Sequence, residues 1–396
     1  MAVTTESREI LSIKNVYKVF GAQPELAMEM LNKGASKDEI FEETGQAVGV
    51  FDASFSVNRG EIFVIMGLSG SGKSTMVRLL NRLIEPTAGT IQLNGREITG
   101  LSDTELLQVR RKDMSMVFQS FALMPHMTVL ENAAFGLSVS GVGEQERHAR
   151  AADALAQVGL GEHGASYPHQ LSGGMQQRVG LARALANDPT ILLMDEAFSA
   201  LDPLIRQEMQ GELIRLQQEQ ERTIIFISHD LEEAIRIGDR IAIMEGGRIV
   251  QIGTPKEILN NPADDYVATF FKGVDVSKVL KAGDIAEKHT DNLITVNGSV
   301  HPFTASTETP YSYLIDEQGL LQGVVSTKGC NGNNTDMQAL QALRINGHHS
   351  IYHDTPLHEV LDTVANTPYP IPVVDRDGLF HGTISRSRLL QTLSHS

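Results

Sequence analysis

The sequence has few of the features that mark several common classes of protein. Its only cysteine is Cys330, which excludes a disulfide within the chain and fits a reducing compartment. No apolar run approaches the roughly 18 residues of a membrane-spanning helix, and the N-terminus lacks the pattern of a signal peptide. We therefore expect a chain that neither spans a membrane nor is exported, so that any role at a membrane depends on a partner.

Basic residues are also scarce. The chain has 33 Lys and Arg against 49 Asp and Glu, which gives a formal net charge of -16. Nucleic-acid binding needs a basic stripe, and no long one is present, so we expect no nucleic-acid partner. The composition is otherwise ordinary for a globular protein, with 41% hydrophobic and 21% charged residues. The length of 396 residues is enough for two or three domains with separate cores.

The strongest positive signal is a glycine-rich loop after the apolar run Ile62–Met66. Its residues have the spacing G-x-x-x-x-G-K-[ST] and are Gly67, Leu68, Ser69, Gly70, Ser71, Gly72, Lys73, Ser74 and Thr75. Glycines let successive backbone N–H groups turn toward a phosphate, the following helix adds partial positive charge, and Lys73 adds a full charge. Ser74 can offer its hydroxyl to Mg²⁺. The sequence therefore predicts a site for a nucleoside triphosphate.

The rest of the first 255 residues predicts an α/β fold. Met76, Leu79, Leu80 and Leu83 have helical spacing, which predicts a helix from the loop to Glu85-Pro86. We expect two short helices as an insertion at about 21–49 and a helical subdomain at about 120–185. Elsewhere apolar strands alternate with helices, which predicts a doubly wound parallel sheet with its site at the carboxyl ends of the strands.

Further candidate residues follow the predicted strands. Asp195 and Glu196 come directly after the apolar run Ile191–Met194, and we interpret Asp195 as a magnesium ligand and Glu196 as the general base for a water molecule. His229 follows another strand and could orient that water and base. Gln119, after Met114–Phe118, could also bind magnesium. The alternatives are an exposed loop start for Asp195-Glu196, a structural histidine for His229 and an ordinary polar strand end for Gln119. The glycine-rich loop favours the chemical interpretation of Asp195-Glu196, and the position of His229 one strand beyond that pair favours it for the histidine.

The order of these motifs resembles that of a known family. The octamer Leu171–Arg178 (LSGGMQQR), the glycine-rich loop, Asp195-Glu196, Ser199–Asp202 and His229 together resemble the ATP-binding cassette (ABC) ATPases over residues 10 to about 255. The resemblance implies that Ser172, Gly173 and Gly174 bind the γ-phosphate of ATP held by a second copy, in a head-to-tail dimer. It also implies that Phe20 stacks on adenine, with a core phenylalanine as the alternative. ATP and Mg²⁺ are the cofactors implied, and ATP hydrolysis is the reaction.

The C-terminal third contains an internal repeat. Residues 314–327 align with residues 373–386 at an offset of 59, with five identities in fourteen positions. The repeat resembles a tandem CBS module, a smaller α+β unit that we place at 281–396, with copies at about 281–336 and 337–396, after a domain at 1–275. Many nucleotide-binding copies carry an aspartate where this chain has Arg388 and Gly329, which weakens the case for adenosine binding.

Four further features are the insertion at about 21–49, the runs Val117–His126 and Asp195–Arg206, and the C-terminal repeat. Together they resemble the ATPase subunits of glycine betaine/proline importers, and the match covers nearly the whole chain. This resemblance implies a peripheral protein at the cytoplasmic face of the bacterial inner membrane, regulated by osmotic conditions through the CBS pair. The implied partners are a membrane permease, docked on residues 120–131, and indirectly a solute-binding protein. The alternative to docking is that these apolar residues are core.

The sequence leaves two rival functions. One is a cassette ATPase acting on DNA or ribosomes, for which the needed insertions and basic surface are absent. The other is a nucleotide-sensing regulatory ATPase without a transport role.

Overall fold

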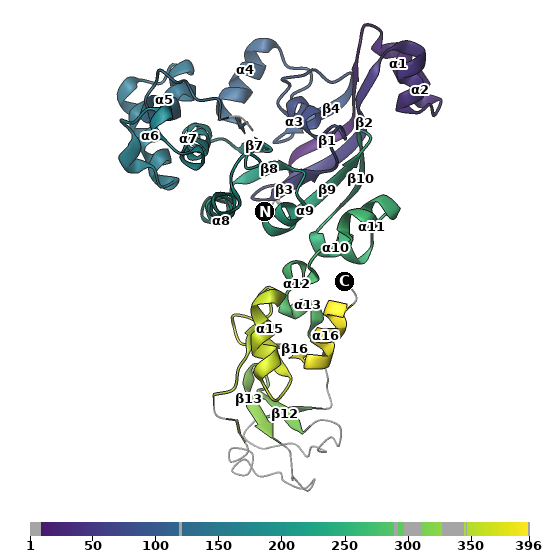
Figure 1. The fold of residues 1–396 in the computed structure, drawn as a ribbon, viewed down its shortest axis with the longest axis vertical. Helices are drawn as coiled ribbons and strands as arrows, with labels where there is room; N and C mark the ends of the chain where they lie inside the picture. The colour runs from purple at the N-terminus through teal and green to yellow at the C-terminus, as the bar shows by residue number, and fades with distance from the viewer. Residues whose placement is uncertain are drawn as a thin grey trace, which may run out of the picture. The chain divides into compact units, whose positions relative to one another are not determined.

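The computed structural model describes residues 9–118, 121–288, 292–296, 310–326, 344–345 and 347–394. The chain divides into two compact units, Met1–Phe271 and Lys272–Ser396, which Figure 1 shows in purple to green and in green to yellow. This division lies a few residues before the boundary at 275–281 that the sequence predicts. None of the helices in the described ranges is both long and apolar enough to cross a membrane.

A six-stranded sheet forms the centre of the first unit, in the order β10-β9-β3-β8-β7-β6. Its strands are β3 (Ile62–Met66), β6 (Met114–Val117), β7 (Ile191–Asp195), β8 (Thr223–Ser228), β9 (Arg240–Glu245) and β10 (Arg248–Gly253). All neighbours pair in parallel except β9 and β10. Every residue of β3, β7 and β8 is buried, as expected for strands covered on both faces. Because β3, β7 and β8 run parallel to one another, their carboxyl ends meet at one edge of the sheet, and the candidate residues follow at that edge.

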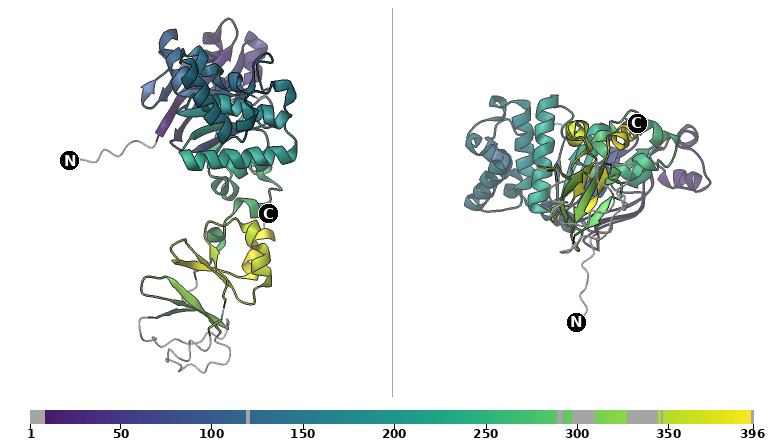
Figure 2. Two further views of the ribbon diagram at one scale, coloured as in Figure 1. Left: turned by 90° about the vertical axis from the view of Figure 1, so that its left-hand side faces the viewer. Right: turned by 90° about the horizontal axis from the view of Figure 1, so that it is seen from below.

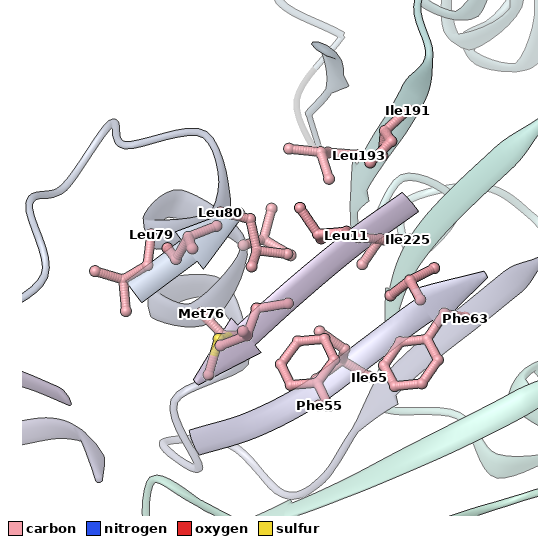
Figure 3. Packing of buried hydrophobic residues seen from close by; sticks show 14 of the residues in the cluster. Leu11, Phe55, Phe63, Ile65, Met76, Leu79, Leu80, Ile191, Leu193 and Ile225 are labelled. Atoms are coloured by element: carbon pink, nitrogen blue, oxygen red, sulfur yellow. The ribbon is translucent and has the colours of Figure 1, made fainter. Parts of the chain in front are cut away.

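A second, antiparallel sheet has the order β2-β1-β4-β5. Its strands are β1 (Glu9–Phe20), β2 (Ala47–Asn58), β4 (Ala88–Leu93) and β5 (Arg96–Glu97). The turn between β4 and β5 has positive φ at both central residues, Asn94 (49°) and Gly95 (74°), which suits a tight hairpin. Figure 3 shows apolar side chains from this sheet, such as Leu11 and Phe55, gathered with Phe63 and Ile225 of the central sheet in one core.

Helix α3 (Lys73–Leu80) packs into this core through Met76, Leu79 and Leu80 (Figure 3). The prediction that the helix continues to Glu85 with Leu83 on its buried face is wrong. The helix ends at Leu80, Arg82 has a φ of 52°, and Leu83 is 52% exposed. The reason is the side chain of Arg82, which is buried and donates hydrogen bonds to the carbonyls of Ile98 and Leu101 and to Glu85. These four hydrogen bonds from a charged group outweigh one more helical turn.

Two groups of helices extend the first unit. Helices α1 (Pro24–Asn32) and α2 (Lys37–Thr44) lie between β1 and β2 and share a small core with them. Helices α5 (Val129–Val139), α6 (Glu144–Gln157) and α7 (Gly173–Leu185) pack together. Figures 1 and 2 show α1 and α2 at one end of the unit and α5, α6 and α7 at the other. The remaining helices of this unit are α4 (Asp103–Lys112), α8 (Pro203–Gln220), α9 (Leu231–Ile237), α10 (Pro255–Asn260) and α11 (Asp265–Phe271), with short 3₁₀ turns at Gly161–His163 and Pro168–Gln170.

The second unit contains two three-stranded sheets with the same topology, a parallel pair followed by an antiparallel one. The sheets are β11 (Leu293–Thr295), β12 (Tyr311–Ile315) and β13 (Leu321–Ser326), and β14 (Ile351–Tyr352), β15 (Ile371–Val374) and β16 (Phe380–Ile384). Helices α12 (Val276–Val279), α13 (Ala282–Ile285), α15 (Leu357–Asn366) and α16 (Arg386–Ser394) accompany them.

The two sequence repeats form equivalent hairpins whose turns pair with each other. The N–H of Leu321 donates to the carbonyl of Gly378 (3.0 Å), and the N–H of Phe380 donates to the carbonyl of Gly319 (3.0 Å). Leu320 and Leu379 form the antiparallel bridge between them. Corresponding residues of the copies thus meet across a local two-fold relationship. Gly329 lies outside the described residues, and Arg388 forms an ion pair with Glu287 (3.4 Å).

Candidate functional site

The glycine-rich loop is closed by backbone that passes too near for side chains. A β-carbon on Gly67 would lie 2.2 Å from the carbonyl oxygen of Met244, and one on Gly72 would lie 2.5 Å from that of Gly49. Both glycines also have φ values in the region that other residues rarely adopt, 153° and 102°. The loop conformation therefore requires glycine at both positions, and it begins helix α3 directly at Lys73.

Lys73 lies at the centre of this loop and is only 5% exposed. Its ammonium group donates hydrogen bonds to the carbonyls of Gly67 (2.8 Å) and Leu68 (2.9 Å). Burial lowers the pKa of Lys73, and the carboxylates of Glu196 and Asp195 oppose that shift. The hydroxyl of Ser71 is buried without a hydrogen-bond partner in the described part of the chain. A buried ammonium group, an unpaired hydroxyl and a helix start fit a phosphate group.

Ser74 and Asp195 bring two oxygen groups together beside the loop. The hydroxyl of Ser74 donates to Oδ1 of Asp195 over 3.0 Å. Burial raises the pKa of Asp195, while the hydrogen bond from Ser74 and the charge of Arg78 lower it. Mg²⁺ is usually bound by one or two protein oxygens together with the phosphates of a substrate. This donor set fits that ion, and two of the three residues that the sequence predicts as ligands, Ser74 and Asp195, are in contact.

Glu196 and His229 meet at the ends of β7 and β8. Nδ1 of His229 lies 3.4 Å from Oε2 of Glu196. Glu196 has a φ of 47°, a costly conformation for a residue other than glycine. Ser199 holds this turn, because its N–H (3.1 Å) and its hydroxyl (2.9 Å) both donate to the carbonyl of Glu196. The carboxylate is thus presented at the sheet edge next to a histidine that can orient it.

Phe20 is an exposed residue beside the loop, so the alternative of a core phenylalanine does not fit its position. Its side chain is 40% exposed, and Nζ of Lys18 lies 5.1 Å from the ring centroid. A β-carbon on Gly49 would lie 2.6 Å from the ring and 3.4 Å from Cγ2 of Thr75. The lack of a β-carbon at Gly49 therefore leaves space beside the ring, near the last residue of the loop, where a flat apolar base could stack.

The octamer begins helix α7 with Ser172 as its N-cap, whose hydroxyl accepts from the N–H of Met175 (3.3 Å). Gly174 is buried against Ile205, since a β-carbon there would lie 2.5 Å from that side chain. Among the residues that the structure describes, no hydrogen bond or ion pair joins Ser172, Gly173 or Gly174 to the glycine-rich loop. A single chain thus leaves these three residues apart from the other candidates.

Two family profiles match the chain, one described as ABC transporter at residues 50–199 and one as CBS domain at residues 348–395. The chain is 55% identical over 388 residues, 97% of each chain, to the glycine betaine/proline betaine transport system ATP-binding protein ProV of Escherichia coli (strain K12). The chain belongs to the ABC transporter family. It is also 50% identical to the glycine betaine transport ATP-binding protein OpuAA of Bacillus subtilis (strain 168), over 97% of this chain and 92% of that one.

A solved structure supports the fold of this ABC protein. A dimeric ATP-binding cassette in a post-hydrolysis state, bound to ADP and Pi, aligns with a TM-score of 0.52 and 32% identity, covering 62% of this chain and 98% of that one. The family resemblance and the α/β fold with a C-terminal CBS domain, both predicted from the sequence, are confirmed. The roles of individual residues remain predictions, and Gln119 lies outside the described residues.

The segment proposed for docking is held by one buried amide of the ABC protein. Asn132 is fully buried, and its Nδ2 donates to the carbonyls of Met124, Met127 and Thr128, while its Oδ1 accepts from the N–H of Met124. Nearby, Arg183 donates to the carbonyls of Phe121 and Ala122. Apart from Val129, the side chains of residues 121–131 are partly or fully exposed, so the segment is not simply core.

Sequence reasoning missed the supporting roles of three residues around the site. The hydroxyl of Ser199 donates to the carbonyl of Glu196, Gly49 leaves space beside Phe20, and Arg206 links two loops through carbonyl groups and one carboxylate. A glycine inside a predicted strand, such as Gly49, was a usable signal for a close approach by another group. No local pattern in the sequence indicates which loop an arginine on the next helix will contact.

Proposed function

We propose that this chain is the ATP-hydrolysing subunit that energises import of glycine betaine, proline or a related compatible solute. The observation that carries the proposal is the meeting of the phosphate loop, Asp195, Glu196 and His229 at one sheet edge. Similarity over nearly the full length to two glycine betaine transport proteins supports the class of solute. A nucleotide-sensing regulator without a transport role is not favoured, because these relatives are named as parts of transport systems.

Each residue of the edge has a separate task in this proposal. The loop amides and Lys73 bind the phosphates of ATP, and Phe20 stacks on the adenine. Ser74 and Asp195 hold Mg²⁺, with Gln119 as a further ligand. Glu196 accepts the proton of the attacking water, and His229 orients Glu196 toward it. Bound Mg²⁺ would neutralise charge on the outer phosphates.

The arrangement favours hydrolysis because its charges are in place before the reaction begins. Lys73 is buried and therefore acts in surroundings of low dielectric, where its attraction for a developing phosphate charge is stronger than in water. The strained backbone at Glu196 is already held by Ser199. Little reorganisation of this chain is then needed when water attacks the γ-phosphate.

Two copies of the chain would form the active unit. Ser172, Gly173 and Gly174 at the start of α7 would bind the γ-phosphate of ATP held by the second copy, because a helix start attracts anions. The dimeric state of the similar solved cassette supports this arrangement. Residues 120–131 would contact a membrane permease at the cytoplasmic face of the inner membrane, and a solute-binding protein would act through that permease. The C-terminal unit would regulate import under osmotic conditions.

The function is tested by uptake of labelled glycine betaine in cells that lack this chain, across a range of medium osmolality. The wild-type gene should restore uptake, and Glu196→Gln should not. The purified variant should still bind ATP while its turnover falls roughly 10²- to 10⁴-fold, because it has lost its general base. Hydrolysis near the wild-type rate would refute the role of Glu196. Failure of a multi-span permease to co-purify with the chain would favour the regulatory alternative.

A further inference from the structure

Arg206 on helix α8 contacts both loops that carry the proposed catalytic pair. One guanidinium nitrogen, Nη2, donates to the carbonyls of Ser199 (3.3 Å) and Leu201 (3.2 Å), in the loop after β7. The other, Nη1, lies 3.5 Å from Oδ2 of Asp230, in the loop after β8. Ser199 is the residue that holds the carbonyl of Glu196, and Asp230 directly follows His229.

These contacts close a ring through the catalytic pair. The Glu196 carboxylate lies against His229, the loop of His229 is held by Asp230 and Arg206, and Arg206 returns through Ser199 to the backbone of Glu196. The ring joins the loop after β7, the loop after β8 and helix α8, so a shift of one loop relative to the other would break at least one of its contacts. We infer that Arg206 is a positioning residue for ATP hydrolysis, one that sets the distance between Glu196 and His229.

The loop after β8 is itself firmly attached, so that Asp230 is a fixed point. Its N–H donates to the hydroxyl of Ser228 (2.9 Å), and its Oδ1 accepts from the N–H of Glu233 (3.2 Å) at the start of α9. Ser228 in turn bonds to the buried carboxylate of Glu233, which also accepts from Gln210 of α8 (3.0 Å). Arg206 therefore ties the more strained turn at Glu196 to a rigid support.

The chemistry of arginine suits this task in a way that lysine does not. The guanidinium group presents several donors in a fixed plane, so one side chain can serve two carbonyls and a carboxylate at once. Nε of Arg206 is buried without a partner in the described part of the chain, a cost that the other contacts must offset. Lysine could keep the attraction to Asp230 but could not hold both loops in one geometry.

The inference rests on the proposed function of Glu196 and is tested by steady-state hydrolysis of MgATP by the full chain. Arg206→Lys should lower kcat roughly 10- to 100-fold, because small misplacements of a catalytic group cost that much, while KM for MgATP stays within about twofold. Arg215→Lys on the same helix is the matched control, since the partners of Arg215 in the described part of the chain, Glu212, Glu219 and Gln157, are not among the residues of the site. It should hydrolyse ATP at the wild-type rate.

A second variant, Asp230→Asn, tests the same contact without depending on the folding of Arg206→Lys. Asp230→Asn retains an oxygen to cap α9 but removes the charge that Arg206 faces. It should lower kcat less than Arg206→Lys, and the double variant should resemble Arg206→Lys, since both act on one contact. An unchanged kcat in Arg206→Lys, or a rise in KM and loss of melting temperature without a kcat effect, would overturn the inference. Normal turnover in Glu196→Gln would instead refute the proposed function.

Discussion

The hydroxyl of Ser74 donates a hydrogen bond to Oδ1 of Asp195 over 3.0 Å, although the two residues are 121 positions apart in the chain. The contact joins the first turn of α3 to the end of β7. It exists because β3 and β7 both pair with β8 in parallel, which brings their carboxyl ends to the same edge. The proposed magnesium site is therefore a product of strand order.

Asp195 should make the stability of the first unit depend on pH. Burial raises its pKa, so the folded chain keeps a proton on this group at pH values where the unfolded chain, with an aspartate pKa of about 3.9, has lost it. The free energy of unfolding should therefore fall as pH rises from about 4 toward the folded pKa. Asp195→Asn has no carboxyl group to titrate, so its free energy of unfolding lacks this fall, and its amide oxygen can still accept from Ser74. Without nucleotide or Mg²⁺, urea unfolding should show the variant gaining stability over wild type as pH rises. A difference in the free energy of unfolding between variant and wild type that does not change with pH would contradict the raised pKa of Asp195.

Mixed dimers should show that each site is built from two copies. Lys73→Ala disables the phosphate loop of its own chain, whereas Ser172→Asp places a negative charge at the start of α7 yet preserves its N-cap. Each variant alone should be inactive. Mixing equal amounts should restore up to about a quarter of wild-type turnover, because half of the dimers are mixed and each has one intact site of two. No recovery above the separate variants would exclude a head-to-tail dimer.

Asn132 should control the docking segment without affecting hydrolysis by the purified chain. Asn132→Ala removes the donor that the carbonyls of Met124, Met127 and Thr128 share, and should destabilise the first unit by about 1–3 kcal/mol. At a temperature where the variant stays folded, we expect nearly normal ATP turnover and reduced uptake of labelled betaine. Asn366→Ala, which alters an exposed amide in the second unit, is the control. Uptake that matches turnover in Asn132→Ala would argue against docking on residues 120–131.

The paired turns of the second unit should respond unequally to the same substitution. Gly319 and Gly378 have φ values of 82° and 88°, so alanine should cost about 1–3 kcal/mol at either position. A β-carbon on Gly319 would also lie 3.1 Å from Leu379, against 4.0 Å from Leu320 for Gly378. Gly319→Ala should therefore lower the melting temperature of the full chain's C-terminal transition more than Gly378→Ala. The control Gly143→Ala, with open space around it, should not change that transition.

Much of this structure could be read from the sequence because the signals are local. The β4–β5 hairpin follows from Asn94-Gly95. Thr128 and Glu131 have the spacing of a capping box, and helix α5 begins directly after Thr128, with Glu131 accepting from the N–H of Thr128. The repeat in the second unit was visible as identities at a fixed offset. That its two turns pair with each other, through Leu321 and Phe380, was not visible, because that contact is set by how the copies assemble.

In the candidate site, too, some features follow from the sequence and others only from the tertiary structure. Sequence spacing alone determined the phosphate loop with Lys73, since only glycines allow its backbone to pass Met244 and Gly49 so closely. It also determined that Asp195 ends one apolar strand and that His229 directly follows another. Tertiary structure alone decided that Arg82 ends helix α3 early and that Arg206 joins the loops of Glu196 and His229. Loop conformation depends on residues that are neighbours in the chain. The partner of a long charged side chain depends on which groups folding leaves within its reach.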